Sequence, residues 1–511
     1  MTCLTPSCYA LPEKDGEYEV LNMNRVKIDL GDTIGAIDRN IFGGFAEHLG
    51  RCIYGGIYEP GSALSDNDGL RKDVLDALKR LRMPLIRYPG GNFASGYRWW
   101  DGVGPVEQRP ARTDLAWHDL EKNRFGTNEF ISFCRKLGTE PYMVVNCGDG
   151  SMREARDWVE YCNGTGESAL VKLRRQHGFS QPHNVKYWGV GNEVDGHWQI
   201  GYKTPQEYAR TFTEYGKVMK WVDPSIKLIA SAVSDWAGEW AERAQLLLEQ
   251  AGGLVDYLSL HWYIGNAEND FNKYMAVSEL IEDRLSAFEG LIKAHSLQKK
   301  LQKPVYLAVD EWNVWYRTYG AEAYKTRLEE IYNLEDALAT AIQLNAFIRH
   351  AGSVKMANLA QIVNVIAPVF TKPDGIFLQS IFYPFEVYSR TCGEKALNAR
   401  WEGDTFSSGD AKAIRTLDIS ATLDESKKQL AVYMVNRSRD KEADLMLEIT
   451  GGSFNNEGVV FIVNGPDIKA VNSFNAPDTV KTNAVKIYPK GQKVNTTLEP
   501  HSVTAMVCEL S

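Results

Sequence analysis

Residues 185–193 read Val-Lys-Tyr-Trp-Gly-Val-Gly-Asn-Glu, and residues 305–313 read Val-Tyr-Leu-Ala-Val-Asp-Glu-Trp-Asn. Each stretch is a short apolar run typical of a buried strand. The first run is followed by Glu193 and the second by Glu311, and a tryptophan-bearing loop follows each glutamate. The two stretches therefore predict a sheet that carries carboxylates at the ends of its strands.

The same kind of run recurs along the first three quarters of the chain. The expected strands cover residues 40–45, 84–88, 141–146, 185–191, 226–231, 257–261, 305–310 and 354–360. Segments with helical spacing of apolar residues lie between them, at 69–82, 127–137, 204–222, 276–295 and 334–350. Strands that alternate with helices indicate parallel strands with helical crossovers. Eight such units predict a (β/α)8 TIM barrel over residues 39–385. The alternative is an open doubly wound sheet, but no glycine-rich dinucleotide fingerprint follows the first strand.

The pattern changes after about residue 390. Short strand-like runs at 430–436, 444–449, 458–463, 484–488 and 503–508 are separated by Gly, Asn, Pro and Asp. Closely spaced strands of this kind predict a C-terminal all-β sandwich over residues 386–511. Residues 26–30 form one more strand ahead of the barrel. From its position, we expect a strand from the 17–38 segment to join the C-terminal sheet.

The net charge and the positions of cysteines and histidines indicate which ligands and cofactors to expect. The 511 residues carry a net charge of −9, which disfavours nucleic acid as the main partner and suits a neutral ligand such as a sugar. The eight cysteines form no Cys-x-x-Cys pair, and the histidines at 48, 197 and 261 lack metal-ligand spacing. We therefore expect buried free thiols, no metal and no cofactor. The N-terminus lacks a secretory pattern, and no apolar run approaches a membrane span, so a cytoplasmic protein is expected.

Polar residues gather where the expected strands end. In characterised barrels the active site lies at these carboxyl ends. The residues concerned are Glu47, Arg87, Asn92, Asn146, Asn192, Glu193, His261, Tyr263, Glu311 and Gln361. A single glutamate at a strand end is ordinarily a solvated loop carboxylate. Two of them on one barrel rim predict glycoside hydrolysis, in which one carboxyl group protonates the leaving oxygen and the other lies opposite it. The distance between the two groups decides between retention and inversion, and the sequence does not fix it.

Five motifs are similar to those of the α-L-arabinofuranosidases of glycoside hydrolase family 51. They lie at residues 45–61, 86–97, 188–201, 310–316 and 359–368, and the resemblance runs from about residue 39 to 390. It implies a retaining enzyme that releases terminal non-reducing α-L-arabinofuranose from arabino-oligosaccharides, arabinoxylan or arabinan. It also implies a homo-oligomer, commonly a hexamer in this family.

Residue roles follow from the same resemblance. It implies Glu193 as general acid/base and Glu311 as nucleophile, with Arg87 beside the nucleophile. It implies a sugar-binding set of Glu47, Asn92, Asn192, Tyr263 and Gln361. These roles require a raised pKa for Glu193, whereas a cation near Glu311 would keep that group ionised. Simpler interpretations remain: Arg87 as a structural ion-pair partner, Asn92 as a turn residue and Tyr263 as packing.

Aromatic residues and two departures from the family bear on substrate range. Trp99, Trp100 and Trp315 are either sugar platforms at the rim or core side chains. Trp262 replaces an expected polar residue, and the segment 317–333 is shorter than in typical members. Both departures are expected at the rim. The alternatives to an exo-acting arabinofuranosidase are an endo-β-glucanase or xylanase on the same barrel and a non-catalytic carbohydrate-binding protein.

Overall fold

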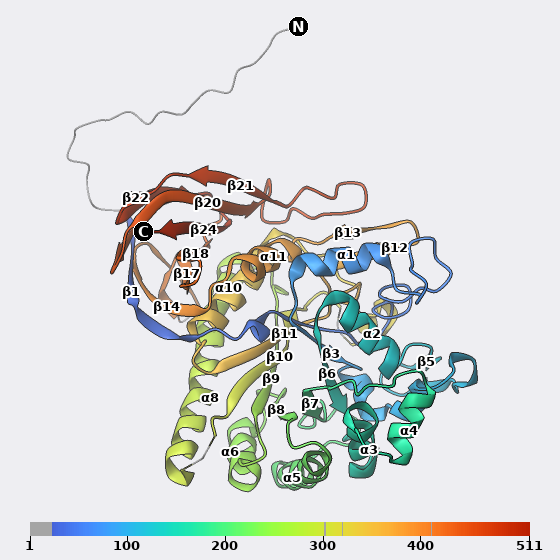
Figure 1. Cartoon of the computed structure of the whole chain (residues 1–511). Helices are drawn as coiled ribbons and strands as arrows, with labels where there is room; N and C mark the ends of the chain where they lie inside the picture. The colour runs from blue at the N-terminus through green and yellow to red at the C-terminus, as the bar shows by residue number, and fades with distance from the viewer. Residues whose placement is uncertain (1–22, 301–302, 319, 410) are drawn as a thin grey trace, which may run out of the picture.

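The computed structural model describes residues 23–300, 303–318, 320–409 and 411–511. Eight parallel strands close into a barrel with helices around it (Figure 1), which confirms the predicted (β/α)8 fold. In chain order the strands are β2 (Gly43–Phe45), β3 (Leu85–Tyr88), β6 (Glu140–Val145), β7 (Tyr187–Val190), β8 (Lys227–Val233), β9 (Tyr257–Ile264), β10 (Tyr306–Val314) and β11 (Val354–Ala360). Each pairs with its neighbour in sequence, and β11 pairs with β2 to close the barrel.

Helices cover the outside of the barrel. They are α1 (Lys72–Leu81), α2 (Thr127–Leu137), α3 (Met152–Asn163), α4 (Ala169–Gln176), α5 (Pro205–Val222), α6 (Trp240–Ala251), α8 (Val277–Lys299), α10 (Leu334–Arg349) and α11 (Phe382–Thr391). Local sequence sets their ends. Thr204 and Glu207 form a capping box that starts α5, and Gly138 ends α2 in the left-handed region at φ 73°. The sequence analysis did not single out α3, α4, α6 or α11.

Three predicted barrel strands differ from the observed strands by three or more residues at one end. The segment Arg39–Phe42 is a 3₁₀ turn, because the Asp38 side chain accepts a hydrogen bond from the Asn40 backbone N–H. Only Gly43–Phe45 of the first prediction is strand. Strands β9 and β10 continue past their predicted ends at 261 and 310. Tyr263 and Glu311 consequently lie within strands, where paired backbone fixes their positions.

In the C-terminal domain β15 (Thr405–Ser408) and β16 (Ala411–Arg415) form a separate hairpin, and ten other described strands form the main sheet. They are β1 (Asn24–Ala36), β14 (Lys395–Glu402), β17 (Leu417–Asp424), β18 (Gln429–Asn436), β19 (Ala443–Thr450), β20 (Phe454–Asn464), β21 (Lys481–Ile487), β22 (Lys490–Gly491), β23 (Lys493–Leu498) and β24 (Val503–Leu510). The predicted all-β architecture is present, as one hydrogen-bonded sheet that curls back on itself where β20 pairs with both β22 and β24. Strand β1 lies between β14 and β19. Residues 17–22 of the expected N-terminal segment lie outside the described residues.

Helix α10 connects the two parts of the molecule. Its residues from Leu334 to Ile348 are all buried, because the barrel lies on one side and the C-terminal sheet on the other (Figure 1). Asn345 and Arg349 on this helix bind the buried Asp418 of β17. Within the described residues, no helix is both long and apolar enough to span a membrane. The six described cysteines carry free thiols.

Candidate active site

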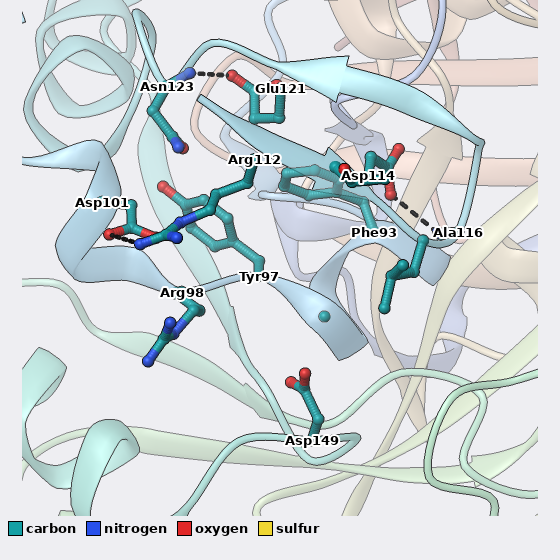
Figure 2. Close-up of a pocket in the computed structure, with 13 residues that line it drawn as sticks. Phe93, Tyr97, Arg98, Asp101, Arg112, Asp114, Ala116, Glu121, Asn123 and Asp149 are labelled. Carbon is teal, nitrogen blue, oxygen red and sulfur yellow. Dashed lines mark hydrogen bonds and ion pairs between the residues drawn. The ribbon is translucent and has the colours of Figure 1, made fainter. Parts of the chain in front are cut away.

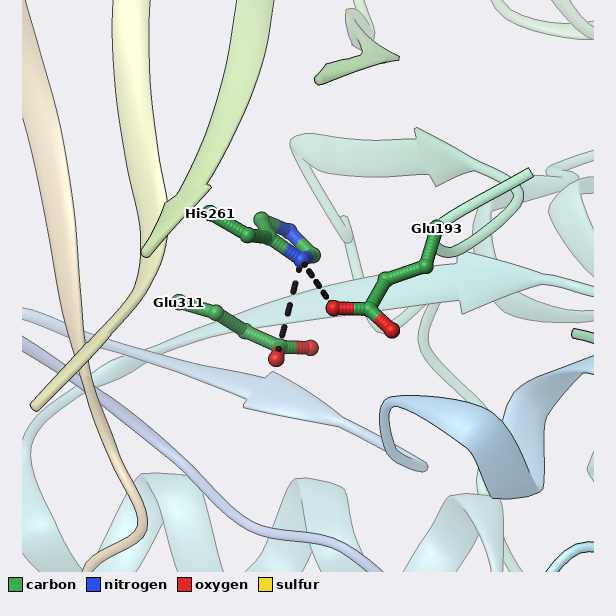
Figure 3. Close-up of side chains that lie close together, drawn as sticks. All are labelled: Glu193, His261 and Glu311. Atoms are coloured by element: carbon green, nitrogen blue, oxygen red, sulfur yellow. Dashed lines mark hydrogen bonds and ion pairs between the residues drawn. The ribbon is translucent and has the colours of Figure 1, made fainter. Parts of the chain in front are cut away.

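Two glutamates meet at the carboxyl ends of the barrel strands. Glu193 follows β7 with a left-handed backbone at φ 44°, and Glu311 lies in β10. One carboxylate oxygen of each glutamate and one ring nitrogen of His261 lie within 4.8 Å of one another. Figure 3 shows His261 on β9 aimed at the space between the two carboxylates. The sequence prediction that these two glutamates flank one site therefore agrees with their geometry.

Glu311 is held from two sides by hydrogen-bond donors. The Arg87 Nη1 atom donates to Glu311 Oε1 at 2.6 Å, and the Tyr263 hydroxyl donates to Glu311 Oε2 at 2.9 Å. Arg87 is almost fully buried, which by itself would lower its pKa, but Glu311 and Asp310 outweigh that effect and raise the Arg87 pKa. The hydrogen bond from this cation is charge-assisted and orients the Glu311 carboxylate. Arg87 and Tyr263 therefore both contact Glu311 directly.

Glu193 has an environment that favours its protonated form. Burial raises its pKa, and the nearby charge of Glu311 raises it further. Hydrogen bonds from His261 and Trp198 oppose the shift without cancelling it. The Trp198 indole N–H donates to Glu193 Oε2 at 2.8 Å, and His261 Nδ1 lies 3.1 Å from Glu193 Oε1. These two contacts fix the orientation of the Glu193 carboxyl group through both of its oxygens.

Asp310 adds a third carboxylate behind the pair. In a regular strand, the neighbours Asp310 and Glu311 would face opposite sides. The pairing of β10 with β9 shifts between Ala308 and Glu311, so both acidic side chains reach the barrel interior. The Tyr142 hydroxyl donates to Asp310 Oδ2 at 2.7 Å. Burial would raise the pKa of Asp310, but Arg87 and His261 lower it to about 2.

Glu47, which follows β2, forms a separate polar group near the nucleophile. Its Oε1 accepts hydrogen bonds from the Phe93 backbone N–H at 3.0 Å and from the Trp117 indole at 2.9 Å, and its Oε2 accepts from the Gln361 amide at 3.0 Å. Burial is the main cause that raises the pKa of Glu47 to about 8, and the charge of Glu311 contributes. Glu47 is therefore a neutral hydrogen-bonding group at pH 7.

The Gly90-Gly91 pair allows the backbone to pass between the two carboxyl groups. A Cβ atom on Gly91 would lie 3.1 Å from Glu311 Oε1 and 3.3 Å from Glu47 Oε2. One on Gly90 would lie 2.6 Å from the Glu47 Cγ atom. Any side chain at these two positions would displace the carboxyl groups.

Asn192 and Gln361 each have a buried polar atom with neither a hydrogen-bond nor an ion-pair partner among the described residues. Asn192 accepts a 2.6 Å hydrogen bond from Arg87 Nη2 through its Oδ1. Among the described residues, neither Asn192 Nδ2 nor Gln361 Oε1 has a hydrogen-bond partner. Buried groups of this kind are costly to leave unpaired, which favours a polar ligand at these atoms. Asn92 lies at the start of the 3₁₀ turn Asn92–Gly96 and is partly exposed.

The candidate aromatic residues have different locations. Trp99 is buried against Trp100 and Trp158, and its indole donates to the Glu154 carbonyl, so it packs in the core. Trp315 packs edge-on against Tyr263, with the two ring centroids 5.3 Å apart.

The expectation that Trp262 lies at the rim is wrong. Trp262 is 3% exposed, and its indole donates to Gln343 of α10. Its neighbours His261 and Tyr263 point into the barrel, so strand alternation turns Trp262 outward toward the helices.

Two loops that contact each other cover the Glu47 side of the site, and we call this pair of loops the clasp. The clasp was not predicted from the sequence. The hairpin of β4 (Arg112–Asp114) and β5 (Asp119–Glu121) carries Trp117. Arg327, from the loop after β10, donates to the Trp117 carbonyl at 2.6 Å and pairs with Asp119 at 3.3 Å. The segment 317–333, predicted to shape the rim, contacts the hairpin in this way. No strand-end signal marks Trp117 or Trp198, because both lie in long loops.

A cavity of about 190 Å³ adjoins the site under this hairpin (Figure 2). Phe93 and Tyr97 form part of its wall, and Arg98 and Asp149 lie at one side of it. Neither catalytic glutamate lines it. It is connected to the site through Phe93, whose backbone N–H binds Glu47.

The chemistry of the site follows from these distances. A separation of about 5 Å between two carboxyl groups is typical of retaining glycosidases, whereas inverting enzymes need roughly 6.5–9.5 Å to hold a water molecule between them. The spacing of at most 4.8 Å between one oxygen of Glu193 and one of Glu311 belongs to the retaining range. The same side chains with His261 could offer atoms to a cation, but Arg87 and Tyr263 already bind the two oxygens of Glu311. The fold and the site together define a retaining glycoside hydrolase.

Comparison with known proteins identifies the family. The family model for the α-L-arabinofuranosidase 1 domain matches residues 77–281, and that for the α-L-arabinofuranosidase C-terminal domain matches residues 310–502. The intracellular exo-α-(1→5)-L-arabinofuranosidase 1 of Bacillus subtilis is 41% identical over 477 residues, which cover 89% of this chain and 93% of that protein. The α-L-arabinofuranosidase of Thermotoga maritima, solved as an arabinose complex, is 37% identical with a TM-score of 0.87, over 95% of this chain and 99% of that chain. A family 51 α-L-arabinofuranosidase from Bifidobacterium longum is 29% identical with a TM-score of 0.91, over 96% of this chain and 100% of that chain. The chain belongs to the α-L-arabinofuranosidases of glycoside hydrolase family 51.

Proposed function

We propose that this enzyme hydrolyses terminal non-reducing α-L-arabinofuranosides with retention of configuration. The observation that carries the proposal is the spacing of Glu193 and Glu311, together with the opposite environments of the two groups. One carboxyl group is held protonated, and the other is paired with a buried arginine. Such a pair separates the roles of acid and nucleophile.

In the first step, Glu193 gives its proton to the glycosidic oxygen while the Glu311 carboxylate attacks the anomeric carbon. The bond from that carbon to the leaving oxygen breaks, and an arabinosyl ester of Glu311 forms. Arg87 and Tyr263 orient Glu311 for the attack through their hydrogen bonds. Trp198 orients Glu193 in the same manner.

In the second step, Glu193 acts as a base. Esterification removes the charge of Glu311, which is one of the causes that raise the Glu193 pKa. The Glu193 carboxylate takes a proton from water, the water oxygen bonds to the anomeric carbon, and Glu311 leaves as a carboxylate. Arabinose is released, and both glutamates return to their starting forms.

The unpaired atoms of Asn192 and Gln361 support a sugar-binding role for these residues. Asn192 Nδ2 is a free donor next to the nucleophile, and Gln361 Oε1 is a free acceptor next to Glu47. A protonated Glu47 can donate to a sugar hydroxyl as well as accept from one. Asn92, partly exposed on the 3₁₀ turn after β3, completes the proposed set.

The substrate is a carbohydrate, and its finer identity is part of the proposal. The Bacillus subtilis relative is named for an exo action on α-(1→5) linkages, so short α-(1→5)-linked arabino-oligosaccharides are the proposed substrates here. Further sugar units would extend toward Trp198, which is 56% exposed, and the cavity in Figure 2. An endo action on glucan or xylan is not favoured by these relatives.

Location and assembly are proposed from the family as well. Relatives named intracellular support a cytoplasmic enzyme, and the family resemblance supports a homo-oligomer, most simply a hexamer. Light scattering after size-exclusion chromatography tests the assembly. A monomeric mass would contradict it.

The activity is tested with 4-nitrophenyl α-L-arabinofuranoside, alongside the β-D-xyloside and β-D-glucoside. We expect fast hydrolysis of the arabinofuranoside and at least a 10⁴-fold loss in Glu311→Ala, on the scale known for removal of a nucleophile. Glu193→Ala should still form the ester with this good leaving group but break it down slowly, and azide should restore turnover. Wild-type rates in Glu193→Ala, or preferential glucan cleavage by the wild type, would overturn the proposal.

A further inference from the structure

His261 is the one described residue that contacts both catalytic glutamates through a single atom. Its Nδ1 lies 3.1 Å from Glu193 Oε1 and 3.6 Å from Glu311 Oε2 (Figure 3). Its Nε2 lies 3.2 Å from Asp310 Oδ1, within ion-pair distance. The side chain is 4% exposed. Carboxyl oxygens close to both ring nitrogens of a buried imidazole favour its doubly protonated, cationic form.

The charged and titratable groups around His261 come from four strands and two loops. They are Arg87 on β3, Tyr142 on β6, Glu193 after β7, Tyr263 on β9, Asp310 and Glu311 on β10, and Glu47 after β2. The two tyrosines are neutral, because burial raises their pKa values well above the usual range. In the starting state of the proposed function Glu193 carries its proton, and burial favours the protonated form of Glu47. The group then holds two cations, Arg87 and His261, and two anions, Asp310 and Glu311.

We propose that His261, held by Asp310, is a positioning residue whose fixed positive charge serves whichever catalytic glutamate is ionised. The inference rests on the proposed function. Before glycosylation the ionised partner is Glu311, and after it the ionised partner is Glu193. The Nδ1 proton faces both acceptors, so the cation changes partner without moving.

The charge count supports this role in each half of the cycle. When the Glu311 ester forms, its negative charge disappears and Glu193 gains one by losing its proton. The two anions are then Asp310 and Glu193, opposite the same two cations, so the buried group is neutral in both states. A buried cluster that changed its net charge during turnover would add a solvation cost to one of the two steps.

Asp310 supplies the fixed anion that this arrangement needs. Ser259 and Tyr142 donate hydrogen bonds to its two oxygens, and Arg87 Nε lies 3.4 Å away, so the carboxylate cannot rotate freely. The low pKa of Asp310, about 2, keeps it charged across the working range. Burial would lower the pKa of His261, but Glu311, Asp310 and Glu193 raise it to about 10.

The test compares pH profiles of kcat/KM for His261→Asn and Asp310→Asn on 4-nitrophenyl α-L-arabinofuranoside. The acidic limb reports Glu311 and the basic limb reports Glu193. Removing the cation disfavours both carboxylates, so His261→Asn should shift both limbs to higher pH by about one unit. Removing the anion has the opposite sign, so Asp310→Asn should shift both limbs to lower pH. Ser259→Ala, which removes a hydrogen bond to Asp310 without changing charge, should lower the rate without shifting the limbs.

Equal rate losses with unmoved limbs in both charge variants would mean that His261 only fills space, and the proposal would be overturned. Neutron diffraction of the wild-type protein at pH 7 gives a readout that does not depend on activity or on the folding of any variant. Deuterons on both ring nitrogens of His261 are expected, and a single deuteron would overturn the proposal. If the wild type lacks arabinofuranosidase activity, the proposed function fails, and the neutron result still decides the charge of His261.

Discussion

At the scale of single residues, the position of a side chain on its strand decides what the sequence can predict. Glu193 and Glu311 could be predicted because each follows an apolar run, and strand ends meet on one rim of a barrel. Arg87 and Tyr263 were predicted for the same reason. The contact of His261 with both glutamates could not be, because it depends on a register shift in β10 that turns Asp310 and Glu311 to one side. A one-residue irregularity leaves no mark in the apolar pattern.

Glu47 gives a prediction about stability as a function of pH. Its pKa in the folded protein is about 8, above the ordinary value of 4.5, so the folded state holds a proton that the unfolded state has lost between these values. The stability that Glu47 contributes is therefore complete below pH 4.5 and is lost as pH rises to 8, by at most about 5 kcal/mol. Glu47→Gln, which is neutral at every pH, should flatten the decline of Tm between pH 5 and 8.

The measurement is differential scanning calorimetry at several pH values, with Glu107→Gln as the control. Glu107 has an exposed side chain, and its replacement should leave the slope of Tm against pH as it is in the wild type. An unchanged slope in Glu47→Gln would mean that Glu47 is already ionised in the folded protein.

At the scale of elements, the barrel strands and long helices could be predicted from periodicity, but the loops over the site could not. The β4–β5 hairpin exposes Leu115 in its turn and Leu120 in β5, and it has no clear alternation of apolar and polar residues. Its importance comes from contacts distant in sequence: Trp117 reaches Glu47, and Arg327 reaches Trp117. Such contacts depend on where the closed barrel places the two loops.

The clasp predicts a selective effect on substrate binding. Arg327→Ala removes the 2.6 Å hydrogen bond to the Trp117 carbonyl and the ion pair with Asp119. The hairpin should become mobile, and Trp117 should hold Glu47 less well. We expect KM for the arabinofuranoside to rise by about 3- to 10-fold, equivalent to about 1 kcal/mol, with kcat changed less than twofold.

Lys325→Ala is the matched control, because Lys325 lies on the same segment and contacts only Glu322 among the described residues. Its kinetic constants should equal those of the wild type. A fall in kcat at constant KM in Arg327→Ala would place the effect of the clasp on the chemical step and would contradict a binding role.

At the scale of the whole molecule, the sequence predicted a barrel followed by a β domain, and the structure shows why the two belong together. Helix α10 has apolar residues on all faces, a pattern typical of a helix covered on every side. Strand β1, before the barrel in sequence, completes the C-terminal sheet between β14 and β19. Neither the partner of α10 nor the position of β1 in the sheet follows from periodicity, since both depend on which surfaces remain uncovered after the barrel closes.

The contact between α10 and β17 predicts how the two parts unfold. Asp418 is 3% exposed and accepts hydrogen bonds from Asn345 and Arg349. Asp418→Ala removes this acceptor from the Asn345 amide and from the Arg349 guanidinium, which retains its bonds to Glu282 and the Ile419 carbonyl. Removing one partner of a buried ion pair costs about 3–5 kcal/mol. Urea unfolding should show one cooperative transition in the wild type and a lower midpoint in Asp418→Ala. Asp440→Ala, which changes an exposed residue of the same sheet domain, should leave the midpoint unchanged within the error of the measurement.

Because Asp418 lies on the C-terminal sheet and the catalytic glutamates lie on the barrel rim, kcat of Asp418→Ala at 25 °C should stay within twofold of the wild type. Two separate transitions in the wild type, with only the second shifted by the mutation, would contradict a single cooperative unit and would mean that the barrel is stable without its β domain.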